Sequence, residues 1–157
     1  MRNLSFTVNG KRRKVRVNDD ETLLSVLRNR LGLKGVKDGC STGDCGACAV
    51  IMDGELVNSC LTLALQARGS IIQTIEGLSS GAKLHPIQSA FINGGAVQCG
   101  YCTPAMILAA KSLLDHEHNP SEESIRRAIS GVLCRCTGYN AIVRSTKTAI
   151  RTRRIKR

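Results

Sequence analysis

Apolar and polar residues alternate at the start of the chain, which predicts a pair of strands. The alternation runs from Leu4 to Val8, breaks at the turn sequence Asn9-Gly10, and resumes over residues 15–17. The apolar spacing then changes to that of a helix over residues 22–31, and Gly32 follows as a helix end. The first part of the chain is therefore predicted to be a β-hairpin with one short helix packed on it.

An irregular loop and a second hairpin are predicted next. Residues 35–48 are rich in Gly, Asp, Ser and Cys and have no periodicity. Apolar runs on both sides of Asp53-Gly54 predict a hairpin over residues 49–57, which would return the chain to Cys60 beside the loop. A further strand is predicted by three isoleucines, Ile71, Ile72 and Ile75.

The second half of the chain has helical spacing. We expect four helices, which fit a small bundle, at residues 86–91, 103–114, 121–130 and 141–150. Thr103 is the expected N-cap of the second of these, with Pro104 at its first helical position, and Ser121 is the expected cap of the third. The sequence GLSSGAK at residues 77–83 is the expected linker, which separates a domain at residues 1–76 from a helical domain with a basic tail at residues 84–157.

Four of the eight cysteines lie in the first half of the chain, at positions 40, 45, 48 and 60. The spacing of the first three matches that of plant-type ferredoxins, which bind a 2Fe-2S cluster, although the fourth ligand of that pattern usually comes much later. The predicted hairpin makes ligation by Cys60 geometrically possible. Glycines around these cysteines permit backbone amides to approach the sulfur atoms closely, and Gly39, Gly43 and Gly46 stand in those places.

The other four cysteines form two close pairs, Cys99 with Cys102 and Cys134 with Cys136, separated by predicted helices. Two such pairs could bind an iron-sulfur cluster or a tetrahedral Zn²⁺ ion. The spacing alone does not distinguish iron from zinc at this second quartet.

The charge of the chain is strongly positive, with a formal net value of +11. Two oxidised clusters ligated by thiolates would lower it to roughly +7. Much of the rest lies near the ends, at residues 11–16 and 151–157, and the chain has only two Phe and two Tyr to stack on bases. We therefore expect a solvated tail or one that docks on an acidic partner, and no nucleic acid.

The N-terminus carries nothing that resembles an export signal, and no apolar stretch approaches the roughly 18 residues that span a membrane. We therefore expect a cytoplasmic protein without membrane contact, in which cysteines stay reduced and hold metal.

Four cysteine motifs together resemble the small iron-sulfur subunit of the xanthine dehydrogenase family of molybdenum hydroxylases. The motifs are GCSTGDCGAC at residues 39–48, SCLTLA at 59–64, VQCGYCTP at 97–104 and LCRCTGY at 133–139. The resemblance runs from residue 3 to about residue 150. It implies an α+β chain, with a ferredoxin-like β-grasp 2Fe-2S domain followed by an all-α four-helix domain that holds a second 2Fe-2S cluster.

The resemblance also implies the direction of electron transfer. Electrons from substrate hydroxylation at a molybdenum-pterin cofactor would pass to the cluster on Cys99, Cys102, Cys134 and Cys136. They would then reach the cluster on Cys40, Cys45, Cys48 and Cys60, and finally FAD. Molybdenum cofactor and FAD would be held by a large and a medium partner subunit, in a heterotrimer or a dimer of heterotrimers.

Two residues are implied to contact the pterin. The Gln98 side chain would hydrogen-bond it, and Cys136 would approach its amino group. Two positions depart from the family pattern, because Ala105 stands where Gly is frequent and Val132 where Asn is frequent. The Val132 side chain cannot form a hydrogen bond near the second cluster. We therefore expect the potential of that cluster to be affected and its ligation to be kept.

The principal hypothesis is an electron-transfer subunit with no catalytic site of its own. Two alternatives come from other classes: a free-standing ferredoxin-like carrier, and a zinc-stapled nucleic-acid-binding module. The substrate of the complex is not specified by this chain, because a purine, another N-heterocycle, an aldehyde, an aromatic thioester or carbon monoxide would be bound by the large subunit.

Overall fold

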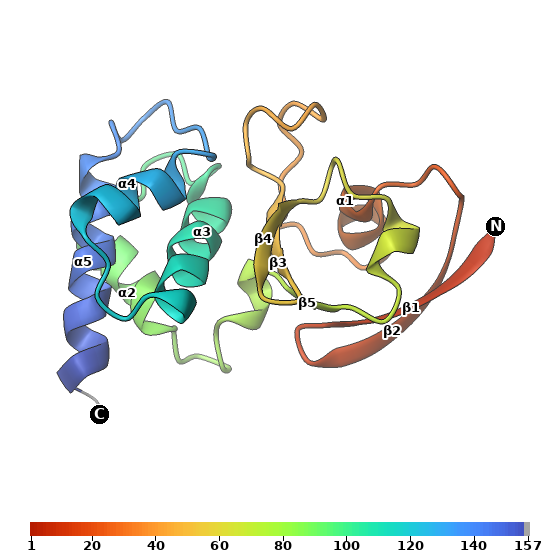
Figure 1. The fold of residues 1–157 in the computed structure, drawn as a ribbon, viewed down its shortest axis with the longest axis horizontal. Coiled ribbons are helices and arrows are strands. Elements are labelled where there is room, and N and C mark those ends of the chain that lie inside the picture. The colour runs from red at the N-terminus through yellow and green to blue at the C-terminus, as the bar shows by residue number, and fades with distance from the viewer. Residues whose placement is uncertain (156–157) are drawn as a thin grey trace.

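The computed structural model describes residues 1–155, and the last two positions of the basic tail lie outside the described residues. A sheet occupies the N-terminal half and a group of helices the C-terminal half, side by side (Figure 1). The strands are β1 (Arg2–Val8), β2 (Lys11–Val17), β3 (Ala49–Met52), β4 (Glu55–Asn58) and β5 (Ile71–Gln73). The helices of the second half are α2 (Pro86–Asn93), α3 (Thr103–His116), α4 (Glu122–Ile129) and α5 (Asn140–Ile155). The chain is thus a mixed α and β protein.

The five strands form one sheet in the order β2-β1-β5-β3-β4. Both predicted hairpins are confirmed: β1 pairs antiparallel with β2, and β3 with β4. Asn9 and Gly10 take positive φ angles of 50° and 74°, which a two-residue turn requires. β5 joins the hairpins by pairing parallel with β1 and antiparallel with β3.

The helix predicted over residues 22–31 is present but not regular. Thr22 caps it by accepting a hydrogen bond from the amide of Ser25, and α1 (Leu23–Ser25) then widens into a π-helical turn, η1 (Val26–Arg30). Its apolar side chains are buried under the sheet. The chain leaves the turn at Gly32, whose φ angle is 71°.

Three local details differ from the predictions. Ile75 lies in a short 3-10 helix, η3 (Ile75–Gly77), and not in the last strand. The N-cap of α3 is Cys102, so Thr103 is already the first helical residue. A further 3-10 helix, η2 (Ala64–Ala67), follows Cys60 and was not predicted. The predicted cap of α4 is confirmed, since the Ser121 hydroxyl accepts from the amide of Ser124.

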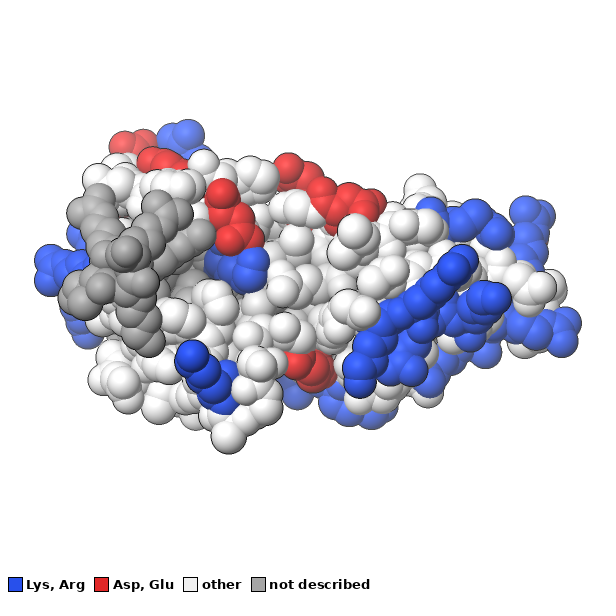
Figure 2. Space-filling view, turned by 90° about the horizontal axis from the view of Figure 1, so that it is seen from below, with Lys and Arg blue, Asp and Glu red and all other residues white. Residues whose placement is uncertain are grey.

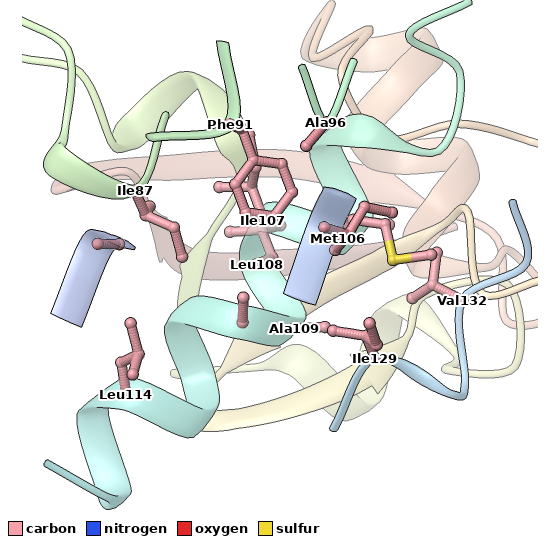
Figure 3. Packing of buried hydrophobic residues seen from close by; sticks show 14 of the residues in the cluster. Ile87, Phe91, Ala96, Met106, Ile107, Leu108, Ala109, Leu114, Ile129 and Val132 are labelled. Atoms are coloured by element: carbon pink, nitrogen blue, oxygen red, sulfur yellow. The ribbon is translucent and has the colours of Figure 1, made fainter. Parts of the chain in front are cut away.

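Strand β3 is buried on both faces and belongs to two hydrophobic cores. Its alternate residues Ala49 and Ile51 pack in the helical core, whereas Cys48 and Val50 pack in the core of the N-terminal half. Figure 3 shows part of the helical core, to which Phe91, Ile107 and Met106 contribute buried side chains. The two halves therefore pack on each other through β3 and α3.

Lys and Arg side chains gather over the β1–β2 end of the molecule (Figure 2). They include the exposed residues Lys11, Arg12, Arg13 and Lys14 of edge strand β2. None of the helices in residues 1–155 combines the length and apolar character needed to cross a lipid bilayer.

Candidate metal centres

The first quartet lies where the first cysteine loop (residues 31–48) meets the β3–β4 hairpin. Cys40 and Cys45 are on the loop, and Cys48 directly precedes β3. The hairpin pairs Ala49 with Asn58, so the chain after β4 returns beside Cys48 and brings Cys60 with it. Cys48 and Cys60 are buried, and Cys40 and Cys45 are partly exposed.

Backbone amides point at one sulfur of this quartet. The amides of Thr42 and Cys45 each donate to the Cys40 Sγ over 3.4 Å. A hydrogen bond from the Thr42 side chain, aided by these amides, lowers the pKa of Cys40 to about 6. These donors stabilise the thiolate, which is the form that binds metal.

Gly39 makes room for the quartet. A Cβ atom at position 39 would lie 2.8 Å from the Cys45 Sγ, closer than real contacts allow. Gly43 has a φ angle of 88°, and a Cβ atom there would lie 2.5 Å from the Leu61 side chain. Gly39 therefore lets the loop wrap closely around the sulfur atoms, and Gly43 is needed for its positive φ angle.

The thiols of the first quartet influence one another's pKa values. Burial raises the pKa of Cys60 to about 11, with a further contribution from a hydrogen bond to Cys48. Burial also raises the pKa of Cys45, and a hydrogen bond with Cys40 adds to it. The charge of Cys48 also raises the pKa of Cys45, and the charge of Cys40 that of Cys60, so the four thiols form one group.

The second quartet lies at the end of the molecule where α3 and α5 begin. Cys99 and Cys102 are on the second cysteine loop (residues 94–102), just before α3. Cys134 and Cys136 are on the third cysteine loop (residues 130–139), between α4 and α5. Cys102 is buried and Cys134 partly exposed, but Cys99 and Cys136 are exposed.

Cys134 is held by hydrogen bonds at both its amide and its sulfur. Its amide donates to the Tyr139 hydroxyl over 2.8 Å. The Thr137 amide donates to its Sγ over 3.4 Å, and the Thr137 hydroxyl lies 3.1 Å from the same atom. Although burial acts in the opposite direction, these Thr137 hydrogen bonds lower the pKa of Cys134.

The thiols of the second quartet likewise influence one another's pKa values. Burial, followed by a hydrogen bond with Cys134, raises the pKa of Cys102 to about 12. A hydrogen bond with the Cys99 side chain raises the pKa of Cys136. Within the described part of the chain, no three His, Cys, Asp or Glu side chains are arranged to hold a single metal ion. Four clustered cysteines match the ligand set of a 2Fe-2S cluster.

Gln98 and Cys136 lie on the exposed rim of the second quartet. Gln98 is exposed and directly precedes Cys99, which contacts Cys136. The two residues with a predicted pterin contact are therefore accessible from outside the chain. The two departures from the family pattern, Ala105 and Val132, are both buried in the helical core.

The loops of the two quartets touch, which the sequence did not predict. The Tyr101 hydroxyl donates to the carbonyl of Asp38 over 2.5 Å, and the Leu133 amide donates to the carbonyl of Cys45 over 2.9 Å. A Cβ atom on Gly46 would lie 2.0 Å from the carbonyl oxygen of Gly131. Glycines at 46 and 131 were visible in the sequence, but no local pattern indicates that they meet.

Comparison with known proteins agrees with two iron-sulfur sites. Residues 6–70 match the family described as "2Fe-2S iron-sulfur cluster binding domain", and residues 74–147 match "[2Fe-2S] binding domain". The nicotinate dehydrogenase small FeS subunit of Eubacterium barkeri is 47% identical over 147 residues, which are 94% of each chain. The xanthine dehydrogenase iron-sulfur-binding subunit of Escherichia coli O157:H7 is 48% identical over 124 residues, 78% of each chain.

A solved structure agrees over the same length. Quinoline 2-oxidoreductase from Pseudomonas putida 86 superposes with a TM-score of 0.93 and 42% identity, over 98% of this chain and 96% of that one. The fold and the two cysteine quartets thus define a 2Fe-2S electron-transfer protein. The chain belongs to the small iron-sulfur subunits of the xanthine dehydrogenase family.

Proposed function

We propose that this chain carries electrons through two 2Fe-2S clusters, from a molybdenum-pterin site on a large partner subunit to FAD on a medium one. Each cluster, when bound, supplies a centre that accepts and releases one electron. Cys40 and Cys45 would hold one iron of the first cluster, and Cys48 and Cys60 the other. In the second cluster the pairs would be Cys99 with Cys136 and Cys102 with Cys134.

The gathering of four cysteines at each of two sites, from loops far apart in the sequence, is the observation that supports this proposal most strongly. The residues around them suit the same role. Amides aimed at the Cys40 sulfur and the Thr137 contacts to Cys134 would stabilise thiolates and set the cluster potentials. Gly39 leaves the space that the first cluster needs.

The second quartet is the better candidate for the side that faces molybdenum. Its sulfur atoms at Cys99 and Cys136 are exposed, and Gln98 beside them can hydrogen-bond a polar group held by another chain. Exposed apolar side chains at Val97 and Leu133 flank this rim and favour a protein contact over solvent. The first quartet, in which Cys40 and Cys45 are partly exposed, would then pass electrons to flavin.

The domain organisation that we propose follows the two quartets. Residues 1–76 would be a ferredoxin-like β-grasp domain, residues 77–83 a linker, and residues 84–157 a four-helix domain. The order of strands and the position of α1 support the first assignment, and α2 to α5 support the second. We propose a heterotrimer or a dimer of heterotrimers in the cytoplasm, where eight cysteines stay reduced.

Purification of the tagged chain from its native host tests this proposal. The masses of the co-purifying chains would be determined together with iron, molybdenum and flavin. We expect a large molybdenum chain, a flavin chain, and about four irons per copy of this subunit. Recovery of the chain alone with the same iron content would contradict the partner assignment, and zinc in place of iron would contradict the cluster assignment.

A further inference from the structure

Tyr101 sits between two cysteines of the second quartet, but its ring lies against the first cysteine loop. Three consecutive residues of that loop surround it. The Lys37 Nζ lies 6.0 Å from the centre of the ring, and the Asp38 carbonyl accepts a hydrogen bond from the hydroxyl over 2.5 Å. A Cβ atom on Gly39 would come within 3.7 Å of the Tyr101 Cε1. The side chain therefore spans from one cysteine loop to the other.

Burial does not account for this position. Tyr101 remains 46% exposed, so much of its apolar surface stays in contact with water. What holds it is a directional hydrogen bond and the cation of Lys37 near the ring. Tyr101 directly precedes Cys102, and its hydroxyl reaches the carbonyl of Asp38, two residues before Cys40.

A second attachment joins the same loops at a different point. The Leu133 amide, next to Cys134, donates to the carbonyl of Cys45 over 2.9 Å. One attachment alone would leave the first cysteine loop free to pivot about it. Two attachments, one on each side of the loop segment between Cys40 and Cys45, fix both its distance and its orientation.

We propose that Tyr101 is a positioning residue that sets the separation of the two clusters by clamping the first cysteine loop against the second; this inference rests on the proposed function. One electron passes from one site to the other, and no bond is made or broken. Tyr101 itself is neither oxidised nor reduced. Because electron transfer slows steeply with distance, a looser loop would slow transfer between the clusters without removing either one.

The variant Tyr101→Phe tests the clamp, because it deletes one hydroxyl and keeps the ring. It would be prepared in the intact complex, and the magnetic splitting between the two reduced clusters would be measured by low-temperature EPR. Loss of one hydrogen bond shifts the balance between clamped and open loops by about 2- to 12-fold. We expect a smaller splitting and slower transfer between the clusters, because magnetic coupling between two spins weakens with distance, while the iron content and the line positions of each cluster stay unchanged.

A second pair of variants examines the other attachment. Leu133→Pro removes the amide that donates to Cys45. Leu133→Ala also shortens the side chain but keeps this amide, so it is the control. The proposal predicts that Leu133→Pro reduces the splitting further in the Tyr101→Phe background and that Leu133→Ala does not.

If the Tyr101→Phe variant shows the same splitting and the same transfer rate as the unchanged complex, the proposed clamp is wrong. Loss of iron from Tyr101→Phe would also overturn it, because the residue would then support ligation and not position. A different failure, the absence of iron from the unchanged complex, would contradict the proposed function itself.

Discussion

The backbone amide of Leu133 donates a hydrogen bond to the carbonyl oxygen of Cys45 over 2.9 Å. These residues are far apart in sequence and belong to different cysteine loops. The bond places a neighbour of Cys134 directly on a cysteine of the first quartet. A hydrogen bond between backbone groups therefore joins the loops of the two candidate clusters directly.

A close approach between these loops depends on Gly46. Its φ angle is 67°, and a Cβ atom would lie 2.0 Å from the carbonyl oxygen of Gly131. We expect Gly46→Ala to lower the free energy of unfolding by about 2 to 4 kcal/mol, because the backbones must separate and a strained φ angle must be kept. Thermal unfolding of the purified protein measures the change.

Gly54→Ala is the matched control for this variant. Gly54 also has a positive φ angle, of 93°, but a Cβ atom there would meet nothing within 4 Å. Gly54→Ala should lower the free energy of unfolding by about 1 kcal/mol, through backbone strain alone. Equal losses in the two variants would show that the contact between Gly46 and Gly131 is unimportant.

Each quartet should lose its iron separately. Replacing Cys60 by Ser removes a buried thiol of the first quartet, and replacing Cys102 by Ser removes one of the second. Because each pair of thiols belongs to one quartet, we expect each variant to lose about two of four irons and to keep the EPR signal of the other cluster. Iron analysis and EPR together check this, and a variant that lost both signals at once would argue against independent sites.

Ile51 should matter to both halves of the molecule. It projects from β3 into the helical core and is 6% exposed. We expect Ile51→Ala to cost about 2 to 4 kcal/mol, through lost apolar contact and a cavity. Chemical denaturation followed by circular dichroism would measure it, with Ile71→Ala as the control, because Ile71 is 65% exposed. A transition that split into two steps in the native protein would contradict the shared packing on β3.

The ion pair between Glu21 and Arg30 should make stability depend on pH. Two hydrogen bonds of 2.7 Å from Arg30 lower the pKa of Glu21 below its usual value of 4.5. A carboxylate with a lowered pKa stabilises the folded state above its unfolded pKa, and this contribution is lost as the pH falls through the lowered value. Glu21→Gln should therefore cost about 1 kcal/mol at pH 7 and progressively less below about pH 4.

Denaturation curves of the two proteins from pH 3 to pH 7 provide the measurement. The Glu123→Gln variant is the control, because Glu123 and its partner Arg127 are both largely exposed. A stability difference for Glu21→Gln that stayed constant with pH would contradict the assigned role of its charge.

Local signals in the sequence account for the elements that were predicted well. Asn9-Gly10 and Asp53-Gly54 adopt positive φ angles, so both hairpins follow from two residues each. Ser121 caps α4 through its own side chain. The cysteine spacing indicated the two quartets for the same reason, because loop ligands lie close together in sequence.

Long-range packing explains what the sequence did not reveal. Nothing near Ala49 and Ile51 indicates that one face of β3 serves a core built from helices. The same holds for Tyr101, whose hydroxyl reaches the carbonyl of Asp38 on another cysteine loop. The π-helical turn after α1 also depends on its surroundings, since the apolar spacing there is that of an ordinary helix.

EPR spectroscopy of the dithionite-reduced native protein tests the central claim most directly. If the eight cysteines hold two 2Fe-2S clusters in different surroundings, the spectrum will contain two distinct signals that together integrate to about two spins per chain. A single signal of about one spin, or an EPR-silent protein that contains zinc, would contradict the assignment of two clusters.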